Sequence, residues 1–411
     1  MQQQPIKINL KKVKYFKIYF LSLLFLIQAT FIIGQVNKLS LKQILDSAKT
    51  NNPHLQNLIL SAQLTGIKGG FINIHPTDIS YYKGNLYSAK IDTRTEITQN
   101  FGSPATWIAN KSLQNEMVKL GIAESELNSR VILASIKSAY YNCVYYNQRL
   151  SLLKELLSVC SEAYPFDSIS VVSNDTLLLE KIISESNIAD LESRKNQAYN
   201  DYLISQNNLV QQAFLNHEAE PSNSQLEMYE IEVNTDTSTR TPSNLFRNYY
   251  KHLYLLSKEK VKVEKSRFFP EIKAGYSNNS INGTNGYSIW QVGVSLPIWI
   301  FEQNNKVKAA KIEQKIAQNE LTWQHSNIDA TTANILTDLN KYFEQLNYFN
   351  GFALKQSQTL LETSKRLFES RKISFNNHIQ NIQAAYKIKL DYLETLINYN
   401  LKAIELEVYA Y

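Results

Sequence analysis

Apolar and polar residues alternate along two separate parts of the chain, and this alternation is typical of β-strands. In the stretch GYSIWQVGVSLPIW, Trp290 and Val292 are expected on one face of a strand, with Gln291 on the other. Segments rich in Gly and Asn, at 83–90 and 278–286, separate the strands of each pair. The pattern therefore predicts two β-hairpins, with strands at 77–84, 91–101, 271–278 and 287–297.

Outside the hairpins, apolar residues recur at helical spacing, and only 12 glycines and 9 prolines interrupt the chain. Each hairpin is followed by a long helix and by a helix that returns. The predicted helices are 105–164, 176–212, 306–370 and 376–409. At a rise of 1.5 Å per residue, the longer ones extend about 90–100 Å. Helices of this length with a narrow apolar stripe pack as coiled coils, not around a globular core.

The two hairpins belong to two copies of one plan. In each copy a proline opens the first strand and another closes the second, 27 or 28 residues later. These prolines are Pro76 and Pro104 in the first copy, and Pro270 and Pro297 in the second. The predicted organisation is a first repeat over 36–215, a polar surface connection over 216–244 and a second repeat over 245–411.

The predicted strands, at eight to eleven residues, are long enough for a tilted crossing of a bilayer. The residues expected toward lipid are Tyr81, Trp290, Val292, Val294 and Leu296, and those expected toward water are Arg94, Glu96, Thr98, Asn100, Gln291 and Ser295. Five aromatic residues near strand ends are expected in an interfacial aromatic girdle: Tyr82, Tyr87, Phe101, Tyr287 and Trp299. A small soluble β-domain with one wet face is the alternative. Four strands cannot close a barrel, so the membrane interpretation requires several chains to combine their hairpins.

The first 35 residues have the order of an export signal. Five lysines between Lys7 and Lys17 precede an apolar run, Tyr19 to Gly34, that is short for a membrane span. We expect residues 1–35 to be a signal peptide, and a single anchor helix is the alternative. Without these five lysines the formal net charge falls from +6 to about +1, which removes the support for nucleic-acid binding.

The residue types that carry chemistry are scattered. No two of the six histidines are four residues apart, and no Gly-rich phosphate loop, nucleophile elbow or pair of catalytic acids occurs. Cys143 and Cys160 are expected about 25 Å apart along one helix, beyond the reach of a disulfide. The sequence therefore predicts no enzyme activity, no cofactor and no resident metal.

Several segments resemble the outer-membrane efflux channel family typified by TolC, in particular the outer-membrane components of heavy-metal and multidrug pumps of the resistance-nodulation-division type. LSLKQILDSAKTNNPHLQNL, residues 39–58, is similar to the opening helix of that family, in which an Asn-Pro pair follows a Leu-rich turn. FFPEIKAGYS and VGVSLPIWIFEQNNKVKAAK are similar to its second hairpin and the helix after it. FGSPATWIANKSLQNEM is a looser version in the first copy.

The resemblance implies a homotrimer in the outer membrane of a Gram-negative bacterium, extending into the periplasm. The fold class is then mainly α with a β-barrel contribution: three chains give four strands each to a twelve-stranded barrel, continuous with an α-helical periplasmic barrel. Pro104 and Pro297 are expected at the junction of barrel and tunnel, because proline suits a strand terminus. The implied function is a passive exit duct for drugs, metal ions or other small molecules. Its implied partners are outer-membrane lipid, a periplasmic adaptor (membrane fusion) protein and an inner-membrane pump.

The inner gate of that family lies at the turns of its two periplasmic helical hairpins. Arg371 stands where glycine is usual, and Asn377 and Gln380 stand where two aspartates are typical of a cation-attracting constriction. We therefore expect a gate lined by amides, with Asp175 as the one acid in each protomer. The full set of gate candidates is Phe166, Asp175, Phe368, Arg371, Asn377 and Gln380.

A different class of function is also compatible with the pattern. The chain could be an exported coiled-coil scaffold or adaptor, soluble in the periplasm, whose β-segments form a small cap. Extraction of membranes with urea or Sarkosyl separates the two hypotheses, since a scaffold is washed off and a membrane duct is retained.

Overall fold

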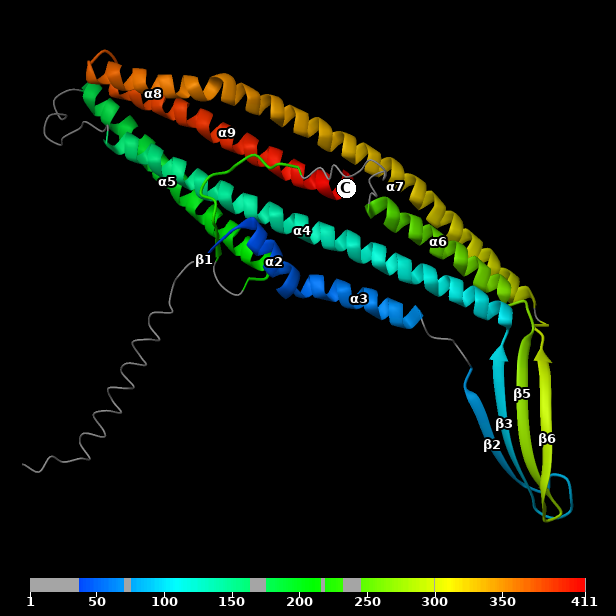
Figure 1. Cartoon of the computed structure of the whole chain (residues 1–411). Helices are drawn as coiled ribbons and strands as arrows, with labels where there is room; N and C mark the ends of the chain where they lie inside the picture. The colour runs from blue at the N-terminus through cyan, green and yellow to red at the C-terminus, as the bar shows by residue number, and fades with distance from the viewer. Residues whose placement is uncertain are drawn as a thin grey trace, which may run out of the picture.

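The computed structural model describes residues 37–69, 75–162, 175–215, 219–231, 245–298 and 300–410. The expected signal peptide and the gate candidate Phe166 lie outside these residues. Figure 1 shows a long body of helices with a four-stranded sheet at one end, whose strands point away from the helix axes.

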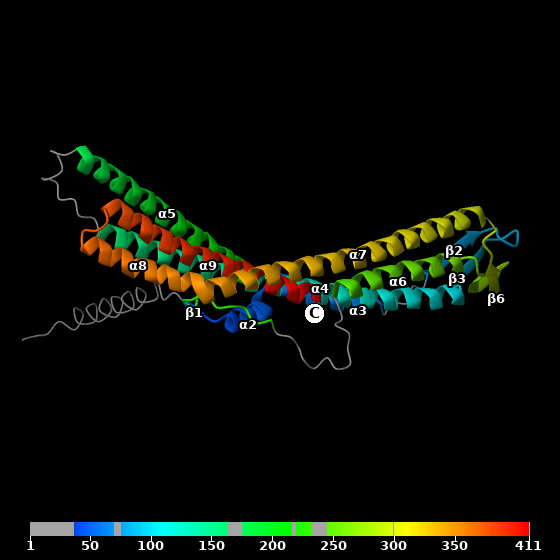
Figure 2. The same ribbon diagram turned by 90° about the horizontal axis from the view of Figure 1, so that it is seen from above.

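The helices account for most of the described chain. They are α2 Leu41–Asn51, α3 Pro53–Gly69, α4 Pro104–Glu162, α5 Asp175–Ala213, α6 Leu245–Ser266, α7 Ile300–Tyr348, α8 Leu354–Glu369 and α9 Phe375–Ala410. Near the sheet, α4 lies between α3 and α6, and α7 packs on the other side of α6. At the far end, α4 lies between α5 and α9, and α8 packs on α9. Figure 2 shows that the body bends near its middle, so that its two halves are inclined to each other.

The opening segment, expected as one helix over 39–58, is divided into α2 and α3. Ser40 starts α2 with a capping box: its hydroxyl accepts from the Gln43 amide, and the Gln43 side chain accepts from the Ser40 amide. Pro53 starts α3 and forces Asn52 before it into an extended conformation, with φ −72° and ψ 116°. The Asn-Pro pair is therefore a break between helices.

The helix predicted over 306–370 is also interrupted. Phe349–Ala353 forms a π-helical turn between α7 and α8, with Gly351 at its centre. A π-turn widens the helix by about one residue and rotates the apolar stripe that follows. This rotation accompanies a change of neighbour, because α7 packs on α6 and α9 whereas α8 packs on α9.

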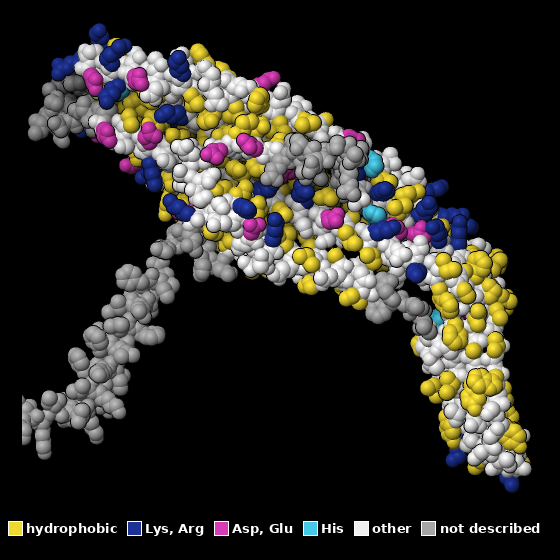
Figure 3. Space-filling view, in the orientation of Figure 1, with side chains coloured by type: hydrophobic (Ala, Val, Ile, Leu, Met, Phe, Trp, Pro, Cys, Tyr) yellow, Lys and Arg dark blue, Asp and Glu magenta, His cyan; other side chains and the backbone are white. Residues whose placement is uncertain are grey.

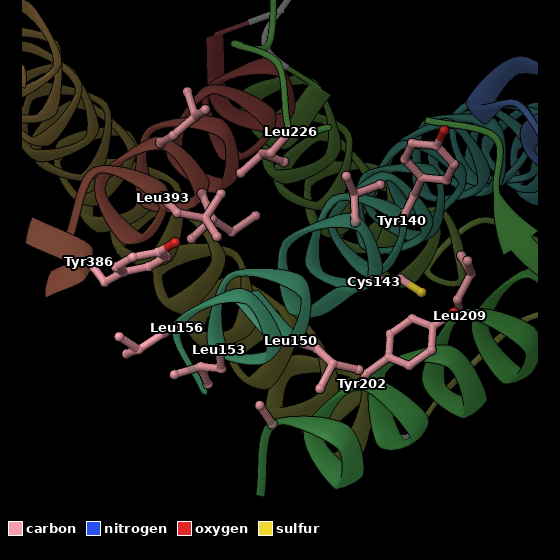
Figure 4. Packing of buried hydrophobic residues seen from close by; sticks show 14 of the residues in the cluster. Tyr140, Cys143, Leu150, Leu153, Leu156, Tyr202, Leu209, Leu226, Tyr386 and Leu393 are labelled. Carbon is pink, nitrogen blue, oxygen red and sulfur yellow. The ribbon is translucent and has the colours of Figure 1, made fainter. Parts of the chain in front are cut away.

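The core is a strip between neighbouring helices. Figure 4 shows its side chains gathered around α4: Tyr140, Cys143, Leu150, Leu153 and Leu156 from α4 meet Tyr202 and Leu209 from α5, and Tyr386 and Leu393 from α9. Cys143 and Cys160 are both free and buried, and burial raises the pKa of each thiol to about 11. Thiols with this pKa remain protonated and serve as packing groups.

The sheet joins the two hairpins. Its strands are β2 Thr77–Gly84, β3 Asp92–Gly102, β5 Glu271–Ile281 and β6 Thr284–Ser295, all antiparallel, in the order β2-β3-β5-β6. The central pairing, β3 with β5, brings together segments that are far apart in the sequence. Two further short strands, β1 Asn37–Leu39 and β4 Ala219–Pro221, pair in parallel beside the helical body.

The second hairpin turns more tightly than the sequence pattern suggested. A tip over 278–286 was expected, but β5 continues to Ile281 and β6 begins at Thr284. Asn282 and Gly283 make the whole turn, with φ of +53° and +81°. Asn-Gly is the preferred pair for a type I′ turn, whose twist matches that of the strands.

Asp92 ties the tips of both hairpins together. Its buried carboxylate accepts from the backbone amides of Tyr87 and Ser88, both at 2.7 Å, in the first tip. The same carboxylate accepts from the Asn282 amide of the second tip at 2.9 Å. One side chain therefore orders the irregular segment 85–91 and fixes it against the neighbouring turn.

The polar connection was expected on the surface, but Leu226 and Tyr229 within it are buried. Gln148 of α4 accepts a hydrogen bond from the Leu226 amide at 2.7 Å. Asn400 of α9 accepts from the Tyr229 amide and donates to the Glu227 carbonyl, each at 2.8 Å. Side-chain amides of the helices thus replace the partners that a strand would supply, and this requirement has no periodic signal in the sequence.

A buried charge cluster completes this attachment. Lys137 of α4 donates to Glu407 of α9 at 2.6 Å and to the Tyr229 hydroxyl at 2.7 Å, and that hydroxyl donates to Glu407 at 2.5 Å. The Lys137 and Glu407 side chains are only 18% and 8% exposed. The cluster links α4, α9 and the connection at one point.

We expect Glu407→Gln to destabilise the protein by about 3 kcal/mol, because it leaves the Lys137 ammonium largely buried without its counter-charge. Glu405→Gln is the matched control, since Glu405 pairs with Lys402 in a more exposed position and its loss costs less than about 1 kcal/mol. Thermal unfolding followed by circular dichroism measures both. Equal melting temperatures for the two variants would show that the buried Lys137–Glu407 pair stabilises the fold no more than the exposed pair does.

Candidate functional site

The sheet has an apolar face that no other described part of the chain covers. The strand register places Ile79, Ile97, Tyr276 and Trp290 in one row across all four strands. Trp290 and Val292 are 81% and 82% exposed. Figure 3 shows hydrophobic side chains gathered over the sheet on the side that faces the viewer. Soluble monomers rarely leave so large an apolar surface open to water.

The opposite face is polar and carries an ion pair. Arg94 lies 2.9 Å from a carboxylate oxygen of Glu96 and donates to the Tyr87 hydroxyl at 3.0 Å. Asn100 donates to the Glu271 carboxylate at 2.9 Å. By register, all the residues expected toward water lie on this face: Arg94, Glu96, Thr98, Asn100, Gln291 and Ser295.

The aromatic girdle is wrong for two of its members. Tyr82 pairs with Arg94, and Tyr287 pairs with Asn279, so both tyrosines lie on the polar face. The Arg94 guanidinium lies 5.9 Å from the centre of the Tyr82 ring. These tyrosines contribute to the polar network and not to an interfacial belt on the apolar face.

The sheet and the helical layer both have open edges. Among the described strands, β2 and β6 each pair on one side only. The outermost helices near the sheet expose apolar side chains: Ile59, Leu60, Leu64 and Ile67 on α3, and Ile312, Ile316, Trp323 and Leu336 on α7. Unpaired strand edges and exposed apolar stripes are the usual places where a further chain binds.

Both junction prolines lie between a strand and a helix. Pro104 is the first residue of α4, where the missing N–H removes no helical hydrogen bond. Pro297 lies between the end of β6 and the start of α7. Gly102 ends β3 with a φ of +73°, a conformation that favours glycine, and the Trp107 indole packs close to it.

Three gate candidates lie in the turn between α8 and α9 or just after it. Arg371 has a φ of +58°, the left-handed region that costs a residue with a Cβ about 1–2 kcal/mol. Its amide donates to the Phe368 carbonyl at 2.9 Å, which closes the end of α8. Asn377 and Gln380 are both exposed and, being three residues apart, share one face of α9.

The other candidates have different surroundings. Phe368 is partly buried, and its ring stacks on that of His378 with centroids 4.7 Å apart and lies 5.9 Å from the Phe375 ring. Asp175 is the first residue of α5, which starts at the same end of the body as the α8–α9 turn. The role of these residues in a gate stays a prediction.

A buried polar cluster next to this turn was not anticipated. His378 is 5% exposed, and its Nδ1 lies 2.8 Å from the Ser364 hydroxyl, which also accepts from Asn381 at 3.1 Å. Burial lowers the pKa of His378 below its ordinary 6.5. The pairing depends on how α8 packs on α9, so the scattered histidines offered no signal for it.

The described residues contain no group of three His, Cys, Asp or Glu side chains placed to hold a metal ion. None of the helices in the described part of the chain combines the length and the apolar character needed to cross a membrane.

No protein-family model matches the chain, and no curated protein matches it. Several solved structures do. The CmeC outer membrane channel of Campylobacter jejuni matches with a TM-score of 0.76 at 14% identity, over 90% of this chain and 84% of that one. The open MtrE outer membrane channel of Neisseria gonorrhoeae matches with a TM-score of 0.73 at 14% identity, over 90% and 88%. A membrane protein of Pseudomonas aeruginosa matches with a TM-score of 0.73 at 12% identity, over 90% and 93%.

These likenesses show that the chain has the fold of the TolC-like outer membrane channels. The resemblance seen in the sequence motifs is therefore confirmed at the level of the fold. The mainly helical class is confirmed as well, and four strands of the described chain form one antiparallel sheet.

We expect acid to destabilise the α8–α9 hairpin through His378. Because the folded state lowers the pKa of this ring, the unfolded chain takes up the proton at a higher pH, and stability falls as the pH drops below about 6.5. His378→Gln should lose fewer degrees of melting temperature between pH 7.5 and pH 5 than the wild type. Replacing the exposed His54 by Gln should leave the pH dependence unchanged. If the melting temperatures of wild type and His378→Gln depend on pH in the same way, protonation of His378 does not cause the loss of stability.

Proposed function

We propose that three copies of this chain form a channel-tunnel in the outer membrane, through which small molecules leave the cell. The two-faced sheet carries the proposal. Its apolar face suits lipid, its polar and charged face suits a water-filled interior, and its strands have the length of a tilted crossing. The fold shared with known outer membrane channels supports the same conclusion.

Closure of the barrel explains the open edges. Three four-stranded sheets make a twelve-stranded barrel when β6 of one copy pairs with β2 of the next, which leaves no edge unpaired. The α7 edge of each copy then meets the α3 edge of its neighbour and covers the exposed apolar stripes on both helices. Contacts of this head-to-tail kind close into a ring under threefold rotation.

Below the barrel, the helices would form the wall of a periplasmic tunnel, with Pro104 and Pro297 at the transition. The duct would be passive, needing no catalytic chemistry from the chain itself. Drugs, metal ions or other small molecules would enter from an inner-membrane pump through a periplasmic adaptor protein. These partners follow from the resemblance of the sequence motifs to the efflux channel family.

A soluble periplasmic scaffold is less compatible with the structure. It would leave Trp290, Val292 and Val294 in water, with exposed fractions between 64% and 82%. At about 25 cal/mol per Å² of apolar surface, covering such a face with lipid or protein is strongly favourable.

Assembly can be tested at the helical edges. We expect Ile316→Glu or Leu64→Glu to prevent trimer formation, because each places a charge in the α7–α3 contact between copies. Asn115→Glu, an exposed change of the same charge on α4, which lies between α3 and α6 of its own chain, should assemble normally. Light scattering in detergent gives the oligomeric state, and planar bilayer recordings show whether the assembled wild type conducts. A monomeric, detergent-independent wild-type protein without conductance would contradict the proposal.

The gate is expected to attract cations only weakly. Amides at positions 377 and 380, with one acid at Asp175 per protomer, place little negative charge at the constriction. Millimolar divalent cations should therefore reduce single-channel conductance only slightly. Strong divalent block, of the kind that a dense carboxylate ring produces, would show that this view of the gate is wrong.

A further inference from the structure

Six lysines lie at the end of the helical body next to the sheet. Three of them lie on α6 and three on α7. Within each helix, consecutive lysines are three or four residues apart, so each set forms a stripe along one helix face. The residues are Lys258, Lys262 and Lys265 on α6, and Lys308, Lys311 and Lys315 on α7. All six are exposed, and α6 and α7 pack against each other.

The lysine patch lies on the same side of the molecule as the apolar face of the sheet. Figure 3 shows basic side chains concentrated at this end of the body, directly above the hydrophobic surface of the sheet and in the same view. That side faces lipid in the barrel and the outside of the tunnel below it. The patch therefore does not line the duct.

Acidic residues do not neutralise the lysine patch. Lys262 pairs with Glu259 at 2.6 Å, but among the described residues the other five lysines have no ion pair. Glu302 and Glu313 of α7 lie about 160° around the helix from the centre of its lysine stripe, on the opposite face. The outward side of α6 and α7 thus carries a net positive charge.

The end of the lysine patch nearest the sheet lies at the height of one membrane surface. Leu296, Ile298 and Phe301 continue the apolar surface to the start of α7, with 63%, 80% and 77% exposed. At 1.5 Å per residue, Lys265, Lys262 and Lys258 lie about 2, 6 and 12 Å from the end of α6. Lys308, Lys311 and Lys315 lie about 12, 17 and 23 Å from the start of α7, so the last two are farther from the sheet than the other four. Lipid headgroups extend roughly 5–8 Å beyond the hydrocarbon, and lysine side chains reach several Å further.

We propose that the lysine patch binds the anionic headgroups of phospholipids in the periplasmic leaflet of the outer membrane. This inference rests on the proposed membrane channel and adds a lipid preference to it. Ammonium groups just beyond an apolar belt attract anionic lipid, and the attraction is weakened by salt. The patch would fix the depth of the trimer in the bilayer and the height at which the tunnel emerges.

The test measures lipid preference in the reconstituted full-length protein. Vesicles of phosphatidylcholine and phosphatidylglycerol are prepared with brominated chains on one lipid or the other, and quenching of Trp290 is isolated by difference from Trp290→Phe. The test variant combines Lys258→Gln, Lys265→Gln, Lys308→Gln and Lys311→Gln. The control removes the same charge from exposed positions at the far end of the body, as Lys355→Gln, Lys365→Gln, Lys372→Gln and Lys387→Gln.

The wild type and the control are expected to prefer phosphatidylglycerol by about fivefold or more at low salt, and to lose the preference in 1 M salt. The test variant should bind both lipids equally while both still quench Trp290. If the wild type binds phosphatidylcholine and phosphatidylglycerol equally, the inference is overturned. An acidic protein surface is then the expected partner of the lysine patch. A preference retained in the test variant would overturn the inference too. If neither lipid quenches Trp290, the membrane channel itself fails, which is a separate result.

Discussion

A β-sheet with one apolar face and two unpaired edges cannot exist alone in water or in lipid. In water the apolar face is exposed, and in lipid the edge amides and carbonyls have no partner. Both problems, the exposed apolar face and the unpaired edge groups, are removed when the sheet becomes part of a closed wall between hydrocarbon and an aqueous interior. The four strands of this chain, with Trp290 and Val292 on one side and Arg94 and Glu96 on the other, have this incomplete character. The proposed assembly follows from that constraint.

The helical body supports the sheet through packing and through a few buried polar groups. α4 begins at the sheet and contacts most of the other helices. The Lys137–Glu407–Tyr229 cluster and Asn400 hold the connection between the two repeats against α4 and α9. These attachments join the two halves of the chain, so that strands from both can form one sheet. The long helix α4, and α7 and α8 in succession, then set the distance between the sheet and the α8–α9 turn.

Much of this fold is visible in the sequence because it depends on periodicity. Alternation predicted the strands and separated the residues of the apolar face from those of the polar face correctly, since a strand places successive side chains on opposite faces. The same alternation places Tyr82, next to Tyr81, and Tyr287, three residues before Trp290, on the polar face. The girdle prediction was wrong for these two tyrosines because it followed residue type and position near strand ends instead. The Asn-Gly pair at 282 and 283 indicates a two-residue turn, but the predicted tip covered the longer segment 278–286. The buried connection and the His378–Ser364 pair depend on contacts between distant segments, which a single sequence does not display.

In the proposed channel, successive residues of β6 meet lipid and water in turn. Nitroxide labels placed singly from position 290 to 295 in the reconstituted protein measure this directly, because oxygen concentrates in lipid and a nickel chelate concentrates in water. We expect high oxygen accessibility at 290, 292 and 294, and high nickel accessibility at 291, 293 and 295. Accessibility that is uniform along the strand, or favours the nickel chelate at every position, would contradict this proposal.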